Sequence, residues 1–254
     1  MIKKNIFIKD DFFFLKYHNR LNKLKFDFNI KQYPLIWKKI YFKEYPRLPN
    51  FLLPLDKNPQ FDLFKALFSR RTKRKSIYKL GLKEISYLLF YSAGINFFKR
   101  NPSNSRRMYP SAGARYPLEI YLFLFSKIEN LPPGAYHYNV KKHSLELIFE
   151  NNFIDECQKA VKNVNQKLIQ SKTILILITS IFGRTALKYG ELTYKLNLLE
   201  AGHLGQNLYL VSQALNLNCC AIGWIDEKIL NKILDLKNEN EIVLYAFAIG
   251  KGSQ

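Results

Sequence analysis

The segment SRRTKRKS, residues 69–76, carries side chains that could bind an anion. Arginine guanidinium groups and a nearby hydroxyl make charge-assisted hydrogen bonds to phosphate oxygens. The candidate ligands in this segment are Arg70, Arg71, Thr72 and Arg74. A solvated basic turn is the alternative interpretation, because runs of Lys and Arg are common on protein surfaces.

A possible proton-transfer pair lies later in the chain, in RTALKYGELTY, residues 184–194. Lys188 and Tyr189 are adjacent, and their side chains have ordinary pKa values of about 10.4 and about 10. In a partly buried site each would favour proton transfer by the other, so either could act as a base. The alternative is the first turn of a helix, with an exposed lysine and a packed tyrosine.

The segment YPSAGARYP, residues 109–117, could bring backbone close to a flat ligand. A glycine between alanines permits close approach, and a proline stiffens the turn. Amides of this turn could point at the nitrogen or oxygen atoms of a ring, and the candidate residues are Pro110, Ser111, Ala112 and Gly113. An ordinary turn before a strand would have the same composition.

Helices and strands must hold these segments in place, and the hydrophobic pattern predicts where they lie. Apolar residues at helical spacing predict helices over 61–68, 82–93, 153–170, 196–217 and 227–236. Apolar runs bounded by polar residues predict strands over 118–125, 136–140, 144–149, 173–182 and 242–250. Three prolines in residues 46–55 predict an extended arm. Because strands and helices alternate without repeats, the pattern indicates a single mixed α/β layered structure.

The composition of the 254 residues excludes several classes of protein. A hydrophobic fraction of 48% is enough for a packed core, so the chain is not intrinsically disordered. The net charge is +20, and 26 basic against 8 acidic side chains lie in the first 120 residues. Such a surface could bind nucleic acid, but the sequence has no nucleic-acid recognition motif or zinc spacing. A phosphate-bearing cofactor or an acidic peptide is the favoured partner.

The cysteines and apolar runs indicate a cytoplasmic protein. Cys157, Cys219 and Cys220 cannot form a disulfide framework, so a reducing, intracellular setting is expected. No apolar run reaches the ~20 residues of a membrane span, and charges interrupt the N-terminal apolar stretch, so we expect a soluble chain with no signal peptide and no membrane partner. No histidine has a partner at metal spacing, so no metal site is expected. No dinucleotide fingerprint, phosphate-binding P-loop or nucleophile elbow is present.

Five blocks of sequence, the last of them in two parts, resemble in order the SagB-type azoline dehydrogenases, a branch of the nitroreductase-like FMN oxidoreductases. RRTKRKS resembles the family pattern RRSxRxF, and PSAGARYPLEIY resembles PSAGAxYPLExY. PGAYHYNVKKHSLE and RTALKYGELTYKLNLLEAGHLGQNLYL follow the next two patterns. AIGWIDEKILNKILDL and EIVLYAFAIG resemble the flavin-contacting C-terminal segment and closing strand. Thr72 replaces the usual serine, and Ser76 replaces the usual apolar residue.

The resemblance implies an α+β, nitroreductase-like fold, in which helices flank a central, mostly antiparallel sheet. It also implies a homodimer with FMN at the subunit interface, an N-terminal arm over residues 1–58 and an FMN-binding domain over residues 59–254. The FMN phosphate, ribityl chain and ring edge would be held by Arg70, Arg71, Thr72 and Arg74. The isoalloxazine would lie along Pro110, Ser111, Ala112 and Gly113, its other edge near Ile222 and Gly223, and Lys251 could add a phosphate contact. Lys188 and Tyr189 match the family's catalytic pair.

In that family the enzymes oxidise peptide-borne thiazolines or oxazolines to azoles during maturation of a ribosomal peptide. A base removes the α-carbon proton, hydride leaves the β-carbon for the flavin, and oxygen reoxidises the flavin. A cyclodehydratase complex and a precursor peptide would be the partners. The sequence does not decide whether Lys188 or Tyr189 is the base. The alternatives are an NAD(P)H-dependent nitroreductase or flavin reductase of broad substrate range, and a basic scaffold protein that has kept the fold and lost the cofactor.

Overall fold

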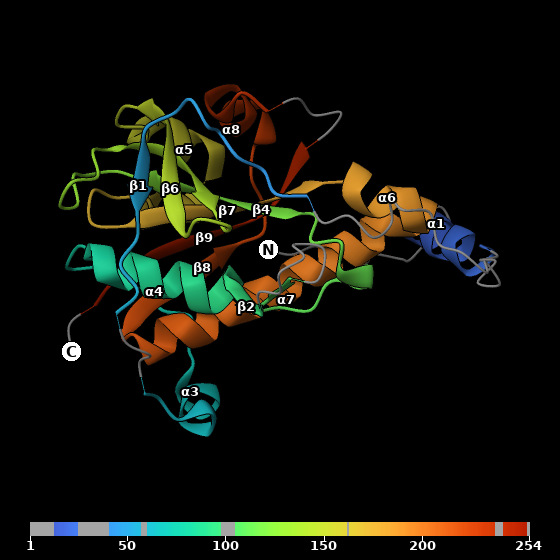
Figure 1. Ribbon diagram of the computed structural model, residues 1–254, viewed down its shortest axis with the longest axis horizontal. Coiled ribbons are helices and arrows are strands. Elements are labelled where there is room, and N and C mark those ends of the chain that lie inside the picture. The colour runs from blue at the N-terminus through green and yellow to red at the C-terminus, as the bar shows by residue number, and fades with distance from the viewer. Residues whose placement is uncertain are drawn as a thin grey trace, which may run out of the picture.

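A seven-stranded sheet forms the centre of the molecule (Figure 1). The computed structural model describes residues 13–24, 41–56, 60–97, 105–161, 163–236 and 241–252. The strands are β1 (Asn50–Leu52), β4 (Leu118–Leu124), β5 (Gly134–Asn139), β6 (Ser144–Glu150), β7 (Ile174–Ile181), β8 (Leu217–Ile222) and β9 (Glu241–Lys251). Their order is β1-β6-β5-β4-β7-β9-β8, and each neighbouring pair is antiparallel. The fold is therefore α+β, as the resemblance implied, and not the α/β arrangement that the alternation of elements suggested.

Helices cover both faces of this sheet. The α-helices are α1 (Phe13–Asn22), α3 (Leu63–Ser69), α4 (Leu82–Ala93), α5 (Ile154–Val161), α6 (Gly183–Tyr189), α7 (Thr193–Ala214) and α8 (Glu227–Leu234). The 3₁₀ segments of the described residues are η2 (Ala112–Ala114), η3 (Asn163–Leu168) and η4 (Gly190–Leu192). A separate small ribbon pairs β2 (Ile95–Phe97) with β3 (Arg106–Arg107). The helices α4 and α7 pack on one face of the large sheet, and α5 and α8 pack on the other.

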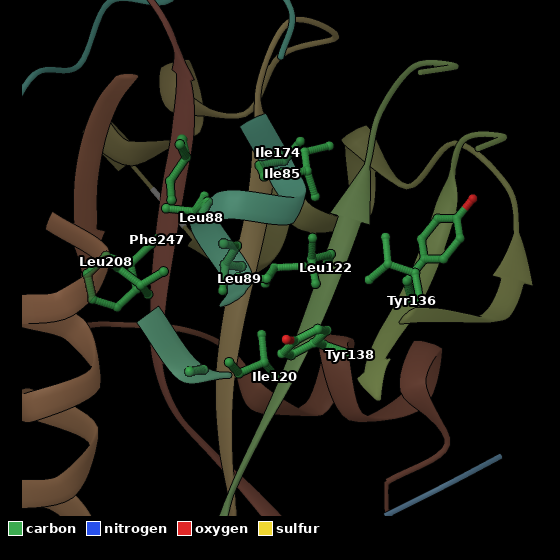
Figure 2. Packing of buried hydrophobic residues seen from close by; sticks show 14 of the residues in the cluster. Ile85, Leu88, Leu89, Ile120, Leu122, Tyr136, Tyr138, Ile174, Leu208 and Phe247 are labelled. Atoms are coloured by element: carbon green, nitrogen blue, oxygen red, sulfur yellow. The ribbon is translucent and has the colours of Figure 1, made fainter. Parts of the chain in front are cut away.

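The two-residue period of β4 explains why both faces are covered. Ile120, Leu122 and Leu124 point to the α4 and α7 side, while Tyr121 and Phe123 point to the α5 and α8 side. All are buried, because both layers of helices are apolar on the inside. Figure 2 shows the first of these cores, in which Ile85, Leu88 and Leu89 of α4 meet Leu208 of α7 and Phe247 of β9.

Most of the predicted elements are present, and two predicted helices end earlier than expected. The prediction of a helix over 82–93 is confirmed by α4, which ends at Gly94. The helix predicted over 153–170 stops at Val161 and is followed by η3. The helix predicted over 196–217 ends at Ala214, because Asn216 adopts a left-handed φ of 55° and the chain then turns into β8. That strand was missed.

The extended arm predicted over 46–55 contributes β1, which pairs with β6 at the edge of the sheet. The proposed division of the chain at residue 58 stays a prediction, and residues 57–59 lie outside the described ranges. The three cysteines are unbonded and buried. Within the described part of the chain, no helix is long and apolar enough to cross a membrane, and no cluster of three His, Cys, Asp or Glu could hold a metal ion.

Candidate active site

Lys188 and Tyr189 occupy the last turn of α6, and both are half-buried. The Lys188 Nζ atom lies 5.3 Å from the centroid of the Tyr189 ring, within range of a cation–π contact. The helix ends at Gly190, whose φ of 51° suits glycine and whose N–H bonds to the carbonyl of Ala186. The end of α6 leaves the two candidate side chains side by side at a helix terminus, where they are partly shielded from water.

The turn that contains η2 meets this pair through Gly113. Gly113 has a φ of 58°, a conformation that residues with a side chain rarely adopt. A Cβ atom placed on Gly113 would lie 2.6 Å from the Tyr189 hydroxyl oxygen and 3.2 Å from the Lys188 Nζ. The structure therefore brings two of the predicted segments into contact, and it shows why the contact position is a glycine.

The same turn is hydrogen-bonded to a buried carboxylate. The Ser111 hydroxyl donates a hydrogen bond of 2.8 Å to Oε2 of Glu200 on α7, and it accepts one of 2.8 Å from the N–H of Tyr116. Glu200 is 3% exposed. Burial raises its pKa to about 7, although Ser111 and the buried Arg107 oppose this shift. Glu200 was not among the predicted residues.

Arg184, at the start of α6, connects this helix to the segment that runs from the η2 turn into β4. Its Nη1 atom lies 2.5 Å from a carboxylate oxygen of Glu119 on β4 and donates to the carbonyl of Tyr116 at 3.0 Å. The backbone carbonyl of Arg184 accepts a hydrogen bond of 3.0 Å from Nε of the buried Arg115. The start of α6 is thus fixed against the segment that runs from the turn into β4.

A buried ionic cluster continues from Arg184 into the sheet. His137 on β5 is fully buried, with Nε2 3.0 Å from Glu119 and Nδ1 2.9 Å from Glu146. A neutral imidazole has one N–H, so two carboxylate partners require the charged form. Burial lowers the pKa of His137, but the two glutamates outweigh it and raise the pKa overall. Burial likewise raises the pKa of Glu119, but Arg184 and His137 lower it to about 2.

The arginine segment lies along β8, in contact with α7. The guanidinium carbon of Arg70 is 5.3 Å from the centroid of the Tyr209 ring, and the Thr72 hydroxyl is 3.3 Å from the Tyr209 hydroxyl. The Tyr209 hydroxyl also accepts a hydrogen bond of 3.0 Å from the N–H of Ala221, next to Ile222. Tyr209 therefore connects two predicted groups of cofactor ligands, although sequence reasoning did not select it.

The other predicted ligands are less constrained in the structure. Arg71, Arg74 and Gly223 are exposed, and the Nη1 atom of Arg71 donates to the carbonyls of Phe68 and Arg70. The Lys251 ammonium donates to Glu84 at 2.7 Å, so its phosphate contact stays a prediction. An open hollow lies between α5 and α8, on the far face of the sheet, and none of the predicted site residues line it.

The described residues fit a flavin mononucleotide, and they form two separate half-sites, one for the phosphate and one for the ring. Guanidinium groups and a hydroxyl near Tyr209 are donors for a phosphate, and the exposed, Cβ-free Gly113 is a surface for a flat ring. Glu200 and Tyr209 are nine residues apart on α7, which places the two halves roughly 13 Å apart along the helix and on opposite flanks of it. In Figure 1, α6 and α3 accordingly lie towards opposite ends of α7.

Comparison with known proteins gives the family. The model of the nitroreductase family matches residues 72–251. The chain belongs to the nitroreductase family. A protein described as a nitroreductase in Methanocaldococcus jannaschii is 29% identical over 70% of this chain and 86% of its own length.

Two further relatives of the chain are named for peptide processing. The trifolitoxin-processing protein of Rhizobium leguminosarum bv. trifolii is 28% identical over 67% of this chain, and the microcin B17-processing protein of Escherichia coli is 27% identical over 66% of it. The matches span 47% and 62% of those two proteins.

Solved structures confirm the fold. A nitroreductase-family structure from Anabaena variabilis superposes with a TM-score of 0.70 over 92% of this chain and 45% of that one, at 24% identity. A chain of the E. coli microcin synthetase complex with bound truncated pro-peptide superposes with a TM-score of 0.60 over 94% of this chain and 82% of that one, at 19% identity. The chain is an oxidoreductase of this family.

Proposed function

We propose that the protein is an FMN-dependent dehydrogenase that oxidises thiazolines or oxazolines in a ribosomally made peptide to azoles. The observation that carries the proposal is the contact of Lys188 and Tyr189 with Gly113, which places a possible base beside a surface suited to a flat ring. Family members named for trifolitoxin and microcin processing support a peptide substrate. A cyclodehydratase complex and a precursor peptide are the proposed partners in a cytoplasmic setting.

The residues of the chain divide the work of such a reaction. Bound FMN supplies a two-electron acceptor for the desaturation. Lys188 or Tyr189 takes the proton from the α-carbon of the ring, and the charge of the lysine stabilises a tyrosine that has lost its proton. Arg184 and Glu200 hold the two backbone segments that carry these groups. Arg70, Arg71, Thr72, Arg74, Ile222, Gly223 and Lys251 would hold the cofactor.

We extend the proposal to a homodimer. One chain presents its phosphate donors and its ring surface on opposite flanks of α7, so a second copy is needed to bring complementary halves together. Phe64 and Phe68 of α3 are 79% and 85% exposed, and Leu199 of α7 is 53% exposed. Phe64 and Phe68 are four residues apart on one face of α3, and because monomeric proteins rarely leave such an apolar pair open, a second copy would cover them.

The test uses a synthetic peptide that carries one thiazoline ring. The double variant Lys188→Ala, Tyr189→Phe is expected to retain FMN, seen by its absorption spectrum, and to lose the two-hydrogen mass change of ring oxidation. The matched control is Tyr194→Phe, Lys195→Ala, which alters the same two residue types at exposed positions in the first turn of α7. Undiminished oxidation by the first variant would contradict the proposal.

A broad nitroreductase or flavin reductase is the second candidate function. The relative that the chain matches over most of its length, from M. jannaschii, is described as a nitroreductase. The two functions are separated by incubation of the purified chain with NADH or NADPH and a quinone. Rapid nicotinamide oxidation without any oxidation of the thiazoline peptide would favour the reductase. A colourless protein that FMN cannot reconstitute would contradict both and favour a scaffold role.

A further inference from the structure

Glu200 connects the long helix α7 to the turn that carries the candidate ring surface. Its Oε2 atom accepts the hydroxyl hydrogen of Ser111 at 2.8 Å, and the nearby backbone of Ala112 lowers the pKa of the carboxyl. The N–H of Tyr116 occupies an acceptor site on the Ser111 oxygen. The hydroxyl hydrogen of Ser111 is therefore left to point at Glu200, and this hydrogen bond restrains the turn at Ser111.

The turn transmits this restraint to the proton-transfer pair. Gly113 follows Ser111 by two residues and is held at a left-handed φ of 58°. A Cβ at Gly113 would approach both Tyr189 and Lys188 within 3.2 Å, so a small shift of the turn changes the space beside the pair. Glu200 is thus placed to act on the pair without contact with it.

The charged and titratable groups near Glu200 come from β3, from the segment that follows it and from β4. Arg107 of β3 and Tyr109, which follows it, are both buried and interact electrostatically with the carboxylate. Glu119 of β4 interacts with both of these side chains. On α7 itself the nearest titratable residue in sequence is His203, which is exposed.

Glu200 changes its charge near neutral pH. Burial raises its pKa to about 7, and the hydrogen bond from Ser111, the charge of Arg107 and the backbone of Ala112 compensate only in part. A hydrogen bond to a charged acceptor is roughly twice as strong as one to a neutral acceptor. The restraint on the turn therefore depends on pH in the range where the enzyme is expected to work.

We propose that Glu200 is a positioning residue: its ionised carboxylate holds Ser111 so that Gly113 fits against Lys188 and Tyr189, and its protonation loosens the turn. The role in the turn stands on the geometry alone. The further step, that the loosened turn binds FMN less tightly, rests on the proposed function.

Amide hydrogen exchange of the chain without added flavin tests the role in the turn. Exchange of residues 111–116 is measured at about pH 6 and about pH 8, one unit on either side of the Glu200 transition, and corrected for the intrinsic effect of pH. In the wild type we expect protection at the lower pH to be about tenfold weaker, since the bond to the charged form is lost. Glu200→Gln should show no such pH dependence. The control Glu156→Gln, on the opposite face of the sheet, should behave as the wild type.

Ser111→Ala gives an independent variant should Glu200→Gln fail to fold. It removes the donor and should leave the turn weakly protected at both pH values. A wild-type pH dependence in either variant would overturn the proposal.

FMN titration separates this proposal from the proposed function. The Kd for FMN is measured for Glu200→Gln and for the wild type, and the ratio of the first to the second should rise at least about threefold from about pH 6 to about pH 8. The ionisation of the FMN phosphate affects both proteins equally and therefore cancels in this ratio. A pH-independent ratio in a chain that binds FMN would overturn the link to the cofactor. Absence of FMN binding at every pH would contradict the proposed function, while the exchange experiment still decides the role of Glu200.

Discussion

Replacement of Gly113 by alanine tests the contact on which the candidate site depends. Two costs are expected. A residue with a Cβ pays about 1 kcal/mol for the left-handed φ of 58°. In addition, the new methyl group would lie 2.6 Å from the Tyr189 hydroxyl, which has to move by several tenths of an ångström. We expect a total loss of about 2 kcal/mol in the free energy of unfolding, because close contacts of this kind contribute about 1 kcal/mol.

A double-mutant cycle separates the two costs. Tyr189→Phe removes the oxygen that the methyl group would meet, but it leaves the φ penalty unchanged. Gly113→Ala should therefore cost about 1 kcal/mol less in the Tyr189→Phe background than in the wild type, as measured by urea unfolding. An equal cost in both backgrounds would refute the assignment of Gly113 as the neighbour of Tyr189.

The same substitution should lower kcat for ring oxidation by tenfold to about a hundredfold, because displacement of a reacting group by about 1 Å can have that effect. Gly202→Ala is the matched control. Gly202 is exposed on α7, and a Cβ there would have no neighbour within 4 Å. It should leave kcat unchanged and raise stability by about 0.5–1 kcal/mol, the usual gain inside a helix.

Two further predictions concern the support of the site and its assembly. Arg184→Met should lower the free energy of unfolding by about 3 kcal/mol, because it leaves Glu119 buried with one cationic neighbour fewer. The control is Arg106→Met, at an exposed position of β3. Equal unfolding midpoints of the two variants would contradict the role of Arg184. The double variant Phe64→Asp, Phe68→Asp should be a monomer in light scattering after gel filtration, and it should bind FMN more weakly than the wild type. The control Leu52→Asp, at an exposed position of the edge strand β1, should stay a dimer with unchanged FMN binding. An unchanged dimer in the double variant would exclude α3 from the interface.

The sequence predicts the centre of this fold better than its edges. The strands of the central sheet are long apolar runs with polar ends, so hydrophobic pattern alone locates them. The strand β8 was missed because LNCCAI follows a long helical pattern without a glycine or proline between them. The break is made by Asn216 in a left-handed conformation, a role that asparagine takes less often than glycine.

Sequence reasoning likewise found some residues of the candidate site and missed others. Lys188, Tyr189 and Gly113 could be selected because their residue types are chemically informative. Glu200 and Arg184 were overlooked because acidic and basic residues are usually exposed. One signal was available for Glu200: it lies beside Asn197, Ala201 and Leu204 on the buried face of α7, where a carboxylate needs an explanation.

The ionic cluster in the sheet has a consequence for how this chain can change over evolutionary time. Glu119, Glu146, His137 and Arg184 contribute two negative and two positive charges to a buried space. Loss of any one leaves an uncompensated charge at a cost of about 3–5 kcal/mol, a large part of the ~5–15 kcal/mol that keeps a domain folded. A lineage can therefore leave this arrangement only by paired substitutions or from a background that is already unusually stable. Descendants that lack His137 are expected to lack at least one of its carboxylate partners as well.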